Sequence, residues 1–125
     1  MAVIKAFECI RPDEKVADRV AALPYDVYNR EEALKEVERE PLSFLAIDRA
    51  ETQFDSSVDT YADCVYDKAR ELLDSRIADG TFITDTDKAY YVYELTMNGR
   101  TQTGIAACAS IDDYNNNIIC LLYTS

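Results

Sequence analysis

The chain has 125 residues, of which 48% are hydrophobic and 30% are charged, a composition typical of globular proteins. It carries 13 Lys and Arg against 24 Asp and Glu, a net charge of −11 that disfavours binding to nucleic acids or anionic membranes. No apolar run approaches the roughly 18 residues of a membrane-spanning helix, and no secretion signal is present. These features predict a cytoplasmic protein of one domain, or part of one.

The first elements lead into a proline bend. Residues 2–9 alternate in part and are rich in β formers, which predicts a strand that Arg11 and Pro12 interrupt. Residues 13–23 repeat apolar side chains at helical spacing. Pro24 ends this short helix, because the residue before a proline avoids the α conformation.

The next segments are a capped helix and an apolar run. Asn29 followed by Glu32 predicts an N-cap and its reciprocal acid at the start of a helix over residues 30–39. Residues 43–49 are predicted to form a short buried strand that ends in Asp48 and Arg49. Residues 50–57 lack periodicity and are predicted to be a loop.

The strongest periodicity covers residues 58–78, where apolar side chains, Tyr61 and Tyr66 among them, recur on one helical face. We expect this amphipathic helix to be the main packing element. Gly80 supplies the left-handed residue that ends it, and residues 81–83 are predicted to form a brief strand.

The dipeptide Asn98-Gly99 predicts a tight hairpin between a strand over residues 89–97 and a return strand over residues 100–111. A two-residue loop would place Tyr93 opposite Gly104. Which face of this hairpin is buried stays open. The predicted fold is α+β: a small mixed or antiparallel sheet, with the hairpin packed on the one long helix and truncated at the C-terminus.

The bend at Pro24, Tyr25 and Asp26 is the first candidate site, because proline presents the aromatic ring and the carboxylate on a stiff loop. The alternative is a structural corner whose acid caps the next helix. Arg49 is the second candidate, since ligands favour the carboxyl ends of strands. A structural ion pair with Asp48 is its alternative.

Other chemistry is weakly indicated. The absence of histidine excludes a histidine base or metal ligand. Four separated cysteines are expected to be buried thiols, and no metal site is predicted. Acids at residues 59, 63 and 67 are expected to form a solvated helix face, with cation binding as the alternative.

Six short segments together resemble the bacterial and archaeal family known as domain of unknown function 1015 (DUF1015). They are IRP at residues 10–12, AALPYDV at 21–27, PLSFL at 41–45, VYDKA at 65–69, GRTQTG at 99–104 and SIDDY at 110–114. The resemblance covers residues 2–119.

The resemblance implies a cytoplasmic protein related to the ParB and sulfiredoxin-like group, which includes nucleotide-dependent serine kinases. Family members carry a downstream Asp-Gly-His-His-Arg element, which this chain lacks. Residues 1–119 are therefore expected to be the N-terminal part of such a domain. Residues 120–125 resemble a non-native read-through tail.

Two hypotheses follow. In the first, the full-length protein is a nucleotide-dependent small-molecule phosphotransferase that uses ATP or ADP with Mg²⁺. Asp26 would be the base or a metal ligand, and Pro24, Tyr25 and Arg49 would bind the ligand. In the second, this region is a non-catalytic scaffold or regulatory module. In both, we expect its partner to be the missing C-terminal portion of its own chain, and we expect the fragment alone to bind no cofactor.

Overall fold

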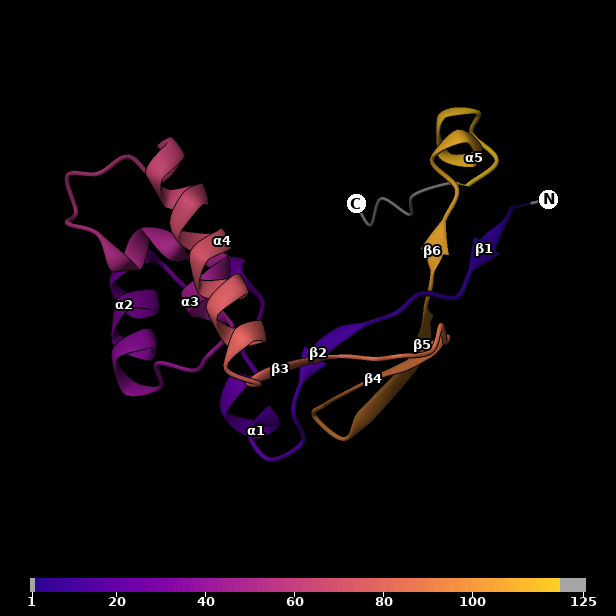
Figure 1. The fold of residues 1–125 in the computed structure, drawn as a ribbon, viewed down its shortest axis with the longest axis horizontal. Coiled ribbons are helices and arrows are strands. Elements are labelled where there is room, and N and C mark those ends of the chain that lie inside the picture. The colour runs from indigo at the N-terminus through magenta and orange to yellow at the C-terminus, as the bar shows by residue number, and fades with distance from the viewer. Residues whose placement is uncertain (1, 120–125) are drawn as a thin grey trace. The chain divides into compact units, whose positions relative to one another are not determined.

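A computed structural model describes residues 2–119 (Figure 1). The chain divides into two compact units, Ile10–Thr84 and the pair of segments Met1–Cys9 and Asp85–Ser125. The expected tail at residues 120–125 lies outside the described residues. The first unit is mainly helical with two short strands, and the second consists of strand pairs and one short helix.

The unit over residues 10–84 is mainly helical. Its elements are β2 (Ile10–Pro12), α1 (Ala17–Val20), η1 (Tyr25–Val27), α2 (Arg30–Arg39), α3 (Leu45–Asp48), η2 (Ala50–Gln53), α4 (Asp63–Ala78) and β3 (Phe82–Thr84). Strands β2 and β3 pair antiparallel, and α4 packs against α3, η2 and β3. The buried cluster is formed by α2 and α3 and consists of Ala33, Val37, Leu45 and Ala46.

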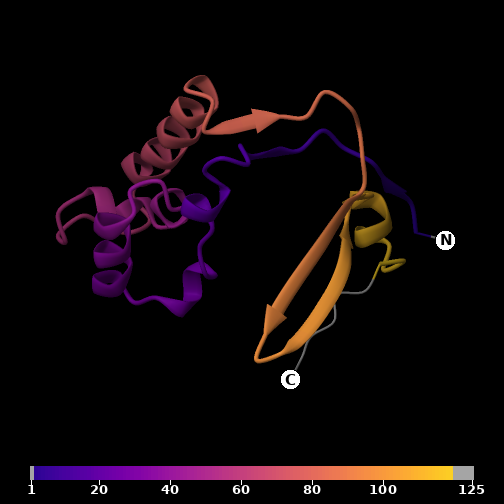
Figure 2. The ribbon, with the colours of Figure 1, turned by 90° about the horizontal axis from the view of Figure 1, so that it is seen from below.

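The other unit is built from antiparallel strand pairs. Its elements are β1 (Ile4–Lys5), β4 (Tyr91–Met97), β5 (Arg100–Ala106), β6 (Cys108–Ala109) and α5 (Ile111–Asn115). Strand β1 pairs with β6, and β4 pairs with β5 in the long hairpin that Figure 2 shows as a two-stranded ribbon. The ring of Tyr91 packs 5.1 Å from that of Phe7, which ties the N-terminal segment to the hairpin.

The predictions made from short sequence motifs, a helix cap and a hairpin turn, were confirmed. Helix α2 has the predicted bounds, and its capping box is complete: the Glu32 N–H donates to the Asn29 side chain, and the Asn29 N–H donates to the Glu32 carboxylate. The turn residues Asn98 and Gly99 have φ values of 51° and 75°, and Tyr93 lies opposite Gly104 as predicted. The mixed α and β class, with small antiparallel sheets, is also confirmed.

The packing of the hairpin on the long helix stays a prediction, because β4–β5 and α4 belong to different units.

Three predicted boundaries were wrong. Residues 43–49 form no strand: they contain the helix α3 (Leu45–Asp48), and short apolar runs do not distinguish a strand from a buried helix. Helix α4 begins at Asp63 and not at residue 58, because the Asp59 carboxylate accepts the Tyr61 N–H in a turn ahead of it. The segment that was expected to break the first strand forms β2 instead.

Arginines hold the irregular segments of the unit over residues 10–84. Arg30 of α2 donates to the carbonyls of Val58 and Asp55 at 3.2 and 3.1 Å. The buried Arg76 of α4 donates to three consecutive carbonyls, those of Pro41, Leu42 and Ser43. The carbonyls of Pro41, Leu42 and Val58 thus find their donors in guanidinium groups, whereas those of Ser43 and Asp55 also accept a backbone N–H.

Among the described residues, no helix combines the length and the apolar character needed to cross a membrane.

Candidate functional site

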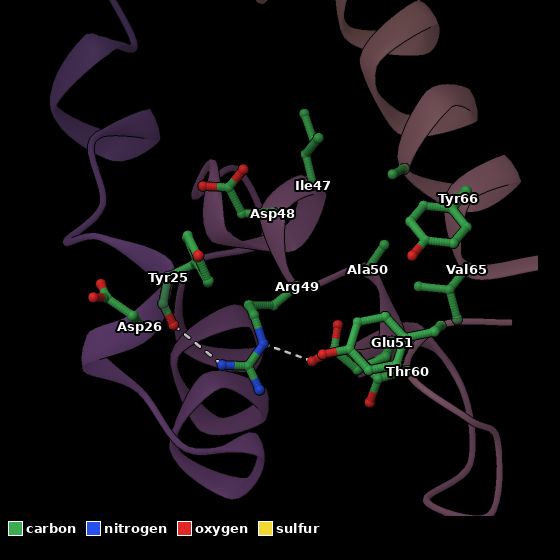
Figure 3. A pocket seen from close by; sticks show the side chains of 12 residues that line it. Tyr25, Asp26, Ile47, Asp48, Arg49, Ala50, Glu51, Thr60, Val65 and Tyr66 are labelled. Carbon is green, nitrogen blue, oxygen red and sulfur yellow. Dashed lines mark hydrogen bonds and ion pairs between the residues drawn. The ribbon is translucent and has the colours of Figure 1, made fainter. Parts of the chain in front are cut away.

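A pocket of about 460 Å³ opens in the unit over residues 10–84, between η1, the segment from α3 to η2, and α4 (Figure 3). It is lined by Tyr25, Asp26, Ile47, Asp48, Arg49, Ala50, Glu51, Thr60, Tyr61, Val65, Tyr66 and Ala69. Its volume falls within the range of about 300–1,000 Å³ that is usual for small-molecule sites.

The structure brings three of the four predicted site residues together. Tyr25 and Asp26 approach the pocket from η1, and Arg49 reaches it from the junction of α3 and η2. Pro24 does not line the pocket; its carbonyl accepts the Val27 N–H at 3.0 Å and so begins the helical turn η1. Its role is to shape the loop that presents its two neighbours.

The guanidinium of Arg49 is largely committed to the protein itself. Its Nε donates to Oε1 of Glu51 at 2.6 Å, and its Nη1 donates to the carbonyl of Tyr25 at 3.1 Å (Figure 3). The same Nη1 donates to the carbonyl of Tyr28 at 2.7 Å. The predicted alternative was an ion pair with Asp48, but the partner is Glu51, whose side chain is only 2% exposed. Arg49 thereby fixes η1 to the start of η2.

Two further acidic residues, Asp26 and Asp48, line the rim of the pocket, and both are solvent-exposed. Neither Asp26 nor Asp48 makes a side-chain hydrogen bond or ion pair within residues 2–119. Desolvation raises the pKa of Asp48 above the ordinary aspartate value. With Glu51 neutralised by Arg49, the pocket keeps an excess of negative charge.

Tyrosine rings form the outer walls. Tyr25, Tyr61 and Tyr66 line the pocket with exposed fractions of 59%, 78% and 57%. Tyr61 and Tyr66 were predicted to lie on one face of a helix over residues 58–78. Tyr66 does lie in α4, whereas the prediction for Tyr61 was wrong. Because Tyr61 precedes α4, it cannot belong to the helical stripe. The Asx-turn residue Asp59, two positions earlier, is the signal that would have shown it.

The sequence profile of the family described as "Protein of unknown function (DUF1015)" matches residues 4–120. The chain belongs to the DUF1015 family. Neither the comparison with curated proteins nor that with solved structures found a significant match.

Other candidate groups in this DUF1015 chain do not form a site. No cluster of three or more His, Cys, Asp or Glu side chains among residues 2–119 is arranged to hold a metal ion. Cys64 and Cys108 are exposed thiols, contrary to the expectation of burial, and Cys120 lies outside the described residues.

The pocket can therefore do two things chemically. Its rim carboxylates can accept a proton or bind a cationic group, since neither is engaged by the protein. Its aromatic walls can pack against the apolar or charged part of a small ligand. A polyphosphate would meet unpaired carboxylates and a guanidinium that already has a counter-ion.

Proposed function

We propose that this region binds a small polar molecule in the pocket, as part of a cytoplasmic, nucleotide-dependent small-molecule phosphotransferase. One observation supports this: Tyr25, Asp26 and Arg49, predicted as site residues from separate segments, converge on one cavity of ligand size. The family resemblance to the ParB and sulfiredoxin-like group supplies the reaction class.

In this proposal Asp26 is the general base that accepts the proton of the attacking hydroxyl. A base needs a carboxylate that is accessible and not already paired, and Asp26 is exposed and unpaired in the described part of the chain. Arg49 is a positioning residue, because its bonds to the Tyr25 carbonyl and to Glu51 fix the loop that carries Asp26.

The nucleotide would bind elsewhere in a longer protein that contains this region. The negative charge of the pocket opposes ATP or ADP, and Arg49, the cation in the pocket wall, is already paired with Glu51. We therefore expect the 125-residue chain to bind no nucleotide tightly. Its own downstream portion is the expected partner, and nucleic acids and membranes are not.

A thermal-shift assay on the longer protein tests the proposal. ADP or ATP with Mg²⁺ at about a hundred times its dissociation constant should stabilise the protein by about 2.7 kcal/mol. Asp26→Asn should lower turnover by at least about a hundredfold and leave the melting temperature unchanged. Asp18→Asn, an exposed acid on α1, is the matched control. The absence of any stabilisation by nucleotide would contradict the proposal of a phosphotransferase. Normal turnover by the Asp26→Asn variant would contradict the proposal that Asp26 is the general base.

A second candidate, a non-catalytic interaction module, is favoured by the hairpin. In the unit formed by residues 1–9 and 85–125, none of the described residues is buried. One face of β4–β5 carries Tyr91, Tyr93, Leu95 and Met97, whereas the other carries hydrogen bonds between Thr96 and Thr101 and between Thr103 and Glu94. An isolated two-stranded hairpin is marginally stable, so its apolar face favours a covering layer.

The substitution Leu95→Lys, made in two contexts, tests that candidate. In the 125-residue chain Leu95 is 55% exposed, so the melting temperature should change little. In a longer protein that covers the hairpin, a buried lysine should lower the melting temperature by several degrees. The module would be favoured by that result together with the absence of a nucleotide response. An unchanged melting temperature in both contexts would reject it.

A further inference from the structure

We propose that the outer edge of β5 pairs with the same edge of a second copy of this chain, so that two hairpins form one four-stranded antiparallel sheet. The inference concerns the backbone edge of the hairpin, whereas the covering layer considered above concerns its apolar face. It depends neither on the pocket nor on the proposed reaction.

Strand β5 has an unprotected edge. Within residues 2–119 it is paired with β4 alone, in a continuous register without a bulge. Its sequence, RTQTGIA, contains one charge, at the first residue, and no proline, and all its residues except the last are exposed. Proteins commonly protect an edge strand with a bulge, a proline, a central charge or a covering element. Since β5 has none of these in the described part of the chain, its outward backbone groups are available to another strand.

The tight turn determines which backbone groups point outward. In a two-residue hairpin the residues that flank the turn, here Met97 and Arg100, exchange backbone hydrogen bonds, and so does every second pair along the ladder. Glu94 and Thr103 lie opposite each other between two such pairs. The N–H and C=O groups of Thr103 therefore point away from β4, towards the outer edge, as do those of the residues two positions away.

A second copy fits this edge in one full-length register. Antiparallel pairing about a twofold axis at Thr103 aligns all seven residues of β5, Arg100–Ala106, with those of the other copy. Arg100 of each copy then lies opposite an alanine, and no like charges face each other. The equivalent pairing of β4 would bring the Glu94 carboxylates of the two copies together, and like charges directly opposite each other destabilise a sheet. The charge pattern therefore favours β5 over β4.

The hairpin is neutral in a chain that is otherwise strongly acidic. The net charge of −11 opposes self-association in general, but residues 91–106 contain only two charged side chains, those of Glu94 and Arg100. Pairing through β5 thus joins the chains at a segment without net charge. It also gives each marginally stable hairpin two additional strands. Because the remaining repulsion is between two acidic chains, dimerisation should strengthen as the salt concentration rises.

Sedimentation equilibrium of the 125-residue chain tests the inference. We expect a reversible equilibrium between monomer and dimer, with a dissociation constant below about 1 mM, as for a small, transient interface. Thr103→Pro removes an outward N–H from each copy and no backbone hydrogen bond of the hairpin, so it should raise the dissociation constant at least about tenfold.

Glu94→Pro is the matched control. It removes an outward N–H at the position directly opposite, on the other edge, and both variants lose the hydrogen bond between Thr103 and Glu94. We expect it to change the dissociation constant by less than about twofold, because the β4 edge takes no part in the dimer.

Isotope-filtered NMR on an equal mixture of labelled and unlabelled chain gives a second test that needs no variant. The proposed register places Gln102 of one copy opposite Gly104 of the other, with Cα atoms about 4.5 Å apart. A contact between their Hα protons should therefore appear between labelled and unlabelled chains.

Four results would contradict the inference. A chain that stays monomeric up to about 1 mM would overturn the dimer. A dimer that Thr103→Pro leaves unchanged, or that Glu94→Pro weakens equally, would not be formed through the β5 edge. A dimer without the contact between Gln102 and Gly104 would have another register. Each of these results leaves the proposed nucleotide-dependent reaction untouched, because that proposal rests on the pocket and on a different assay.

Discussion

Removal of the Arg49 guanidinium is the most direct test of how the pocket is built. Arg49→Met keeps the aliphatic bulk but deletes three bonds, one to Glu51 at 2.6 Å and two to the carbonyls of Tyr25 and Tyr28. Glu51 is only 2% exposed and would be left as a buried, unpaired carboxylate. Breaking such a pair costs about 3–5 kcal/mol. Because 16% of the Arg49 side chain is exposed and water can enter, we expect about 3 kcal/mol.

Urea unfolding followed by circular dichroism measures this loss. With a slope of about 1.5 kcal/mol per molar urea, the midpoint should fall by about 2 M. The double variant Arg49→Met/Glu51→Leu should lose less, since it removes the buried charge as well. Arg70→Met is the control, because its pair with Asp74 is exposed and should contribute less than about 0.5 kcal/mol. A double variant as unstable as Arg49→Met would refute the reasoning.

Three further predictions concern single side chains. Asn29→Ala should cost about 1 kcal/mol in urea unfolding, because it removes the α2 cap. Arg76→Met should cost about 3 kcal/mol in the same assay, because it leaves the carbonyls of Pro41 and Leu42 without a donor. Arg39→Met, at an exposed site, should cost little. Asp48→Asn should stabilise the chain at neutral pH. The folded pKa of Asp48 is raised, so the wild-type chain is penalised as pH rises through and above the ordinary value of about 3.9, and the gain should vanish below it.

What could be predicted from sequence was mostly local. The capping box at Asn29 and the turn at Asn98 and Gly99 are set by residues within a few positions of each other, and both were confirmed. The strand predicted over residues 43–49 was wrong because the conformation of this segment depends on distant contacts: Leu45 and Ala46 are buried against α2. An apolar run of that length reads the same in a strand and in a buried helix.

The site was predictable in part for the same reason. The bend at residues 24–26 is marked by proline, and the position of Arg49 in a charged pair was visible, but its partner was not. Glu51 was assigned to a polar loop, although it is one of the most buried side chains in the described part of the chain. Sequence shows where a charge lies and not which neighbour neutralises it. The convergence of η1, η2 and α4 on one pocket depends on tertiary packing, which the local sequence does not show.

The groups that stabilise this unit and those that face the pocket are different. Arg30, Arg49 and Arg76 each donate to backbone carbonyls, and their loss should destabilise the chain. Asp48 and Tyr66 do the reverse: one carries an uncompensated charge and the other exposes an aromatic ring. Side chains that cost stability at a cavity wall are expected where a ligand supplies the missing contacts. If Asp48→Asn stabilises the free chain, the carboxylate is kept at a cost to the fold, as is common for side chains that serve a function.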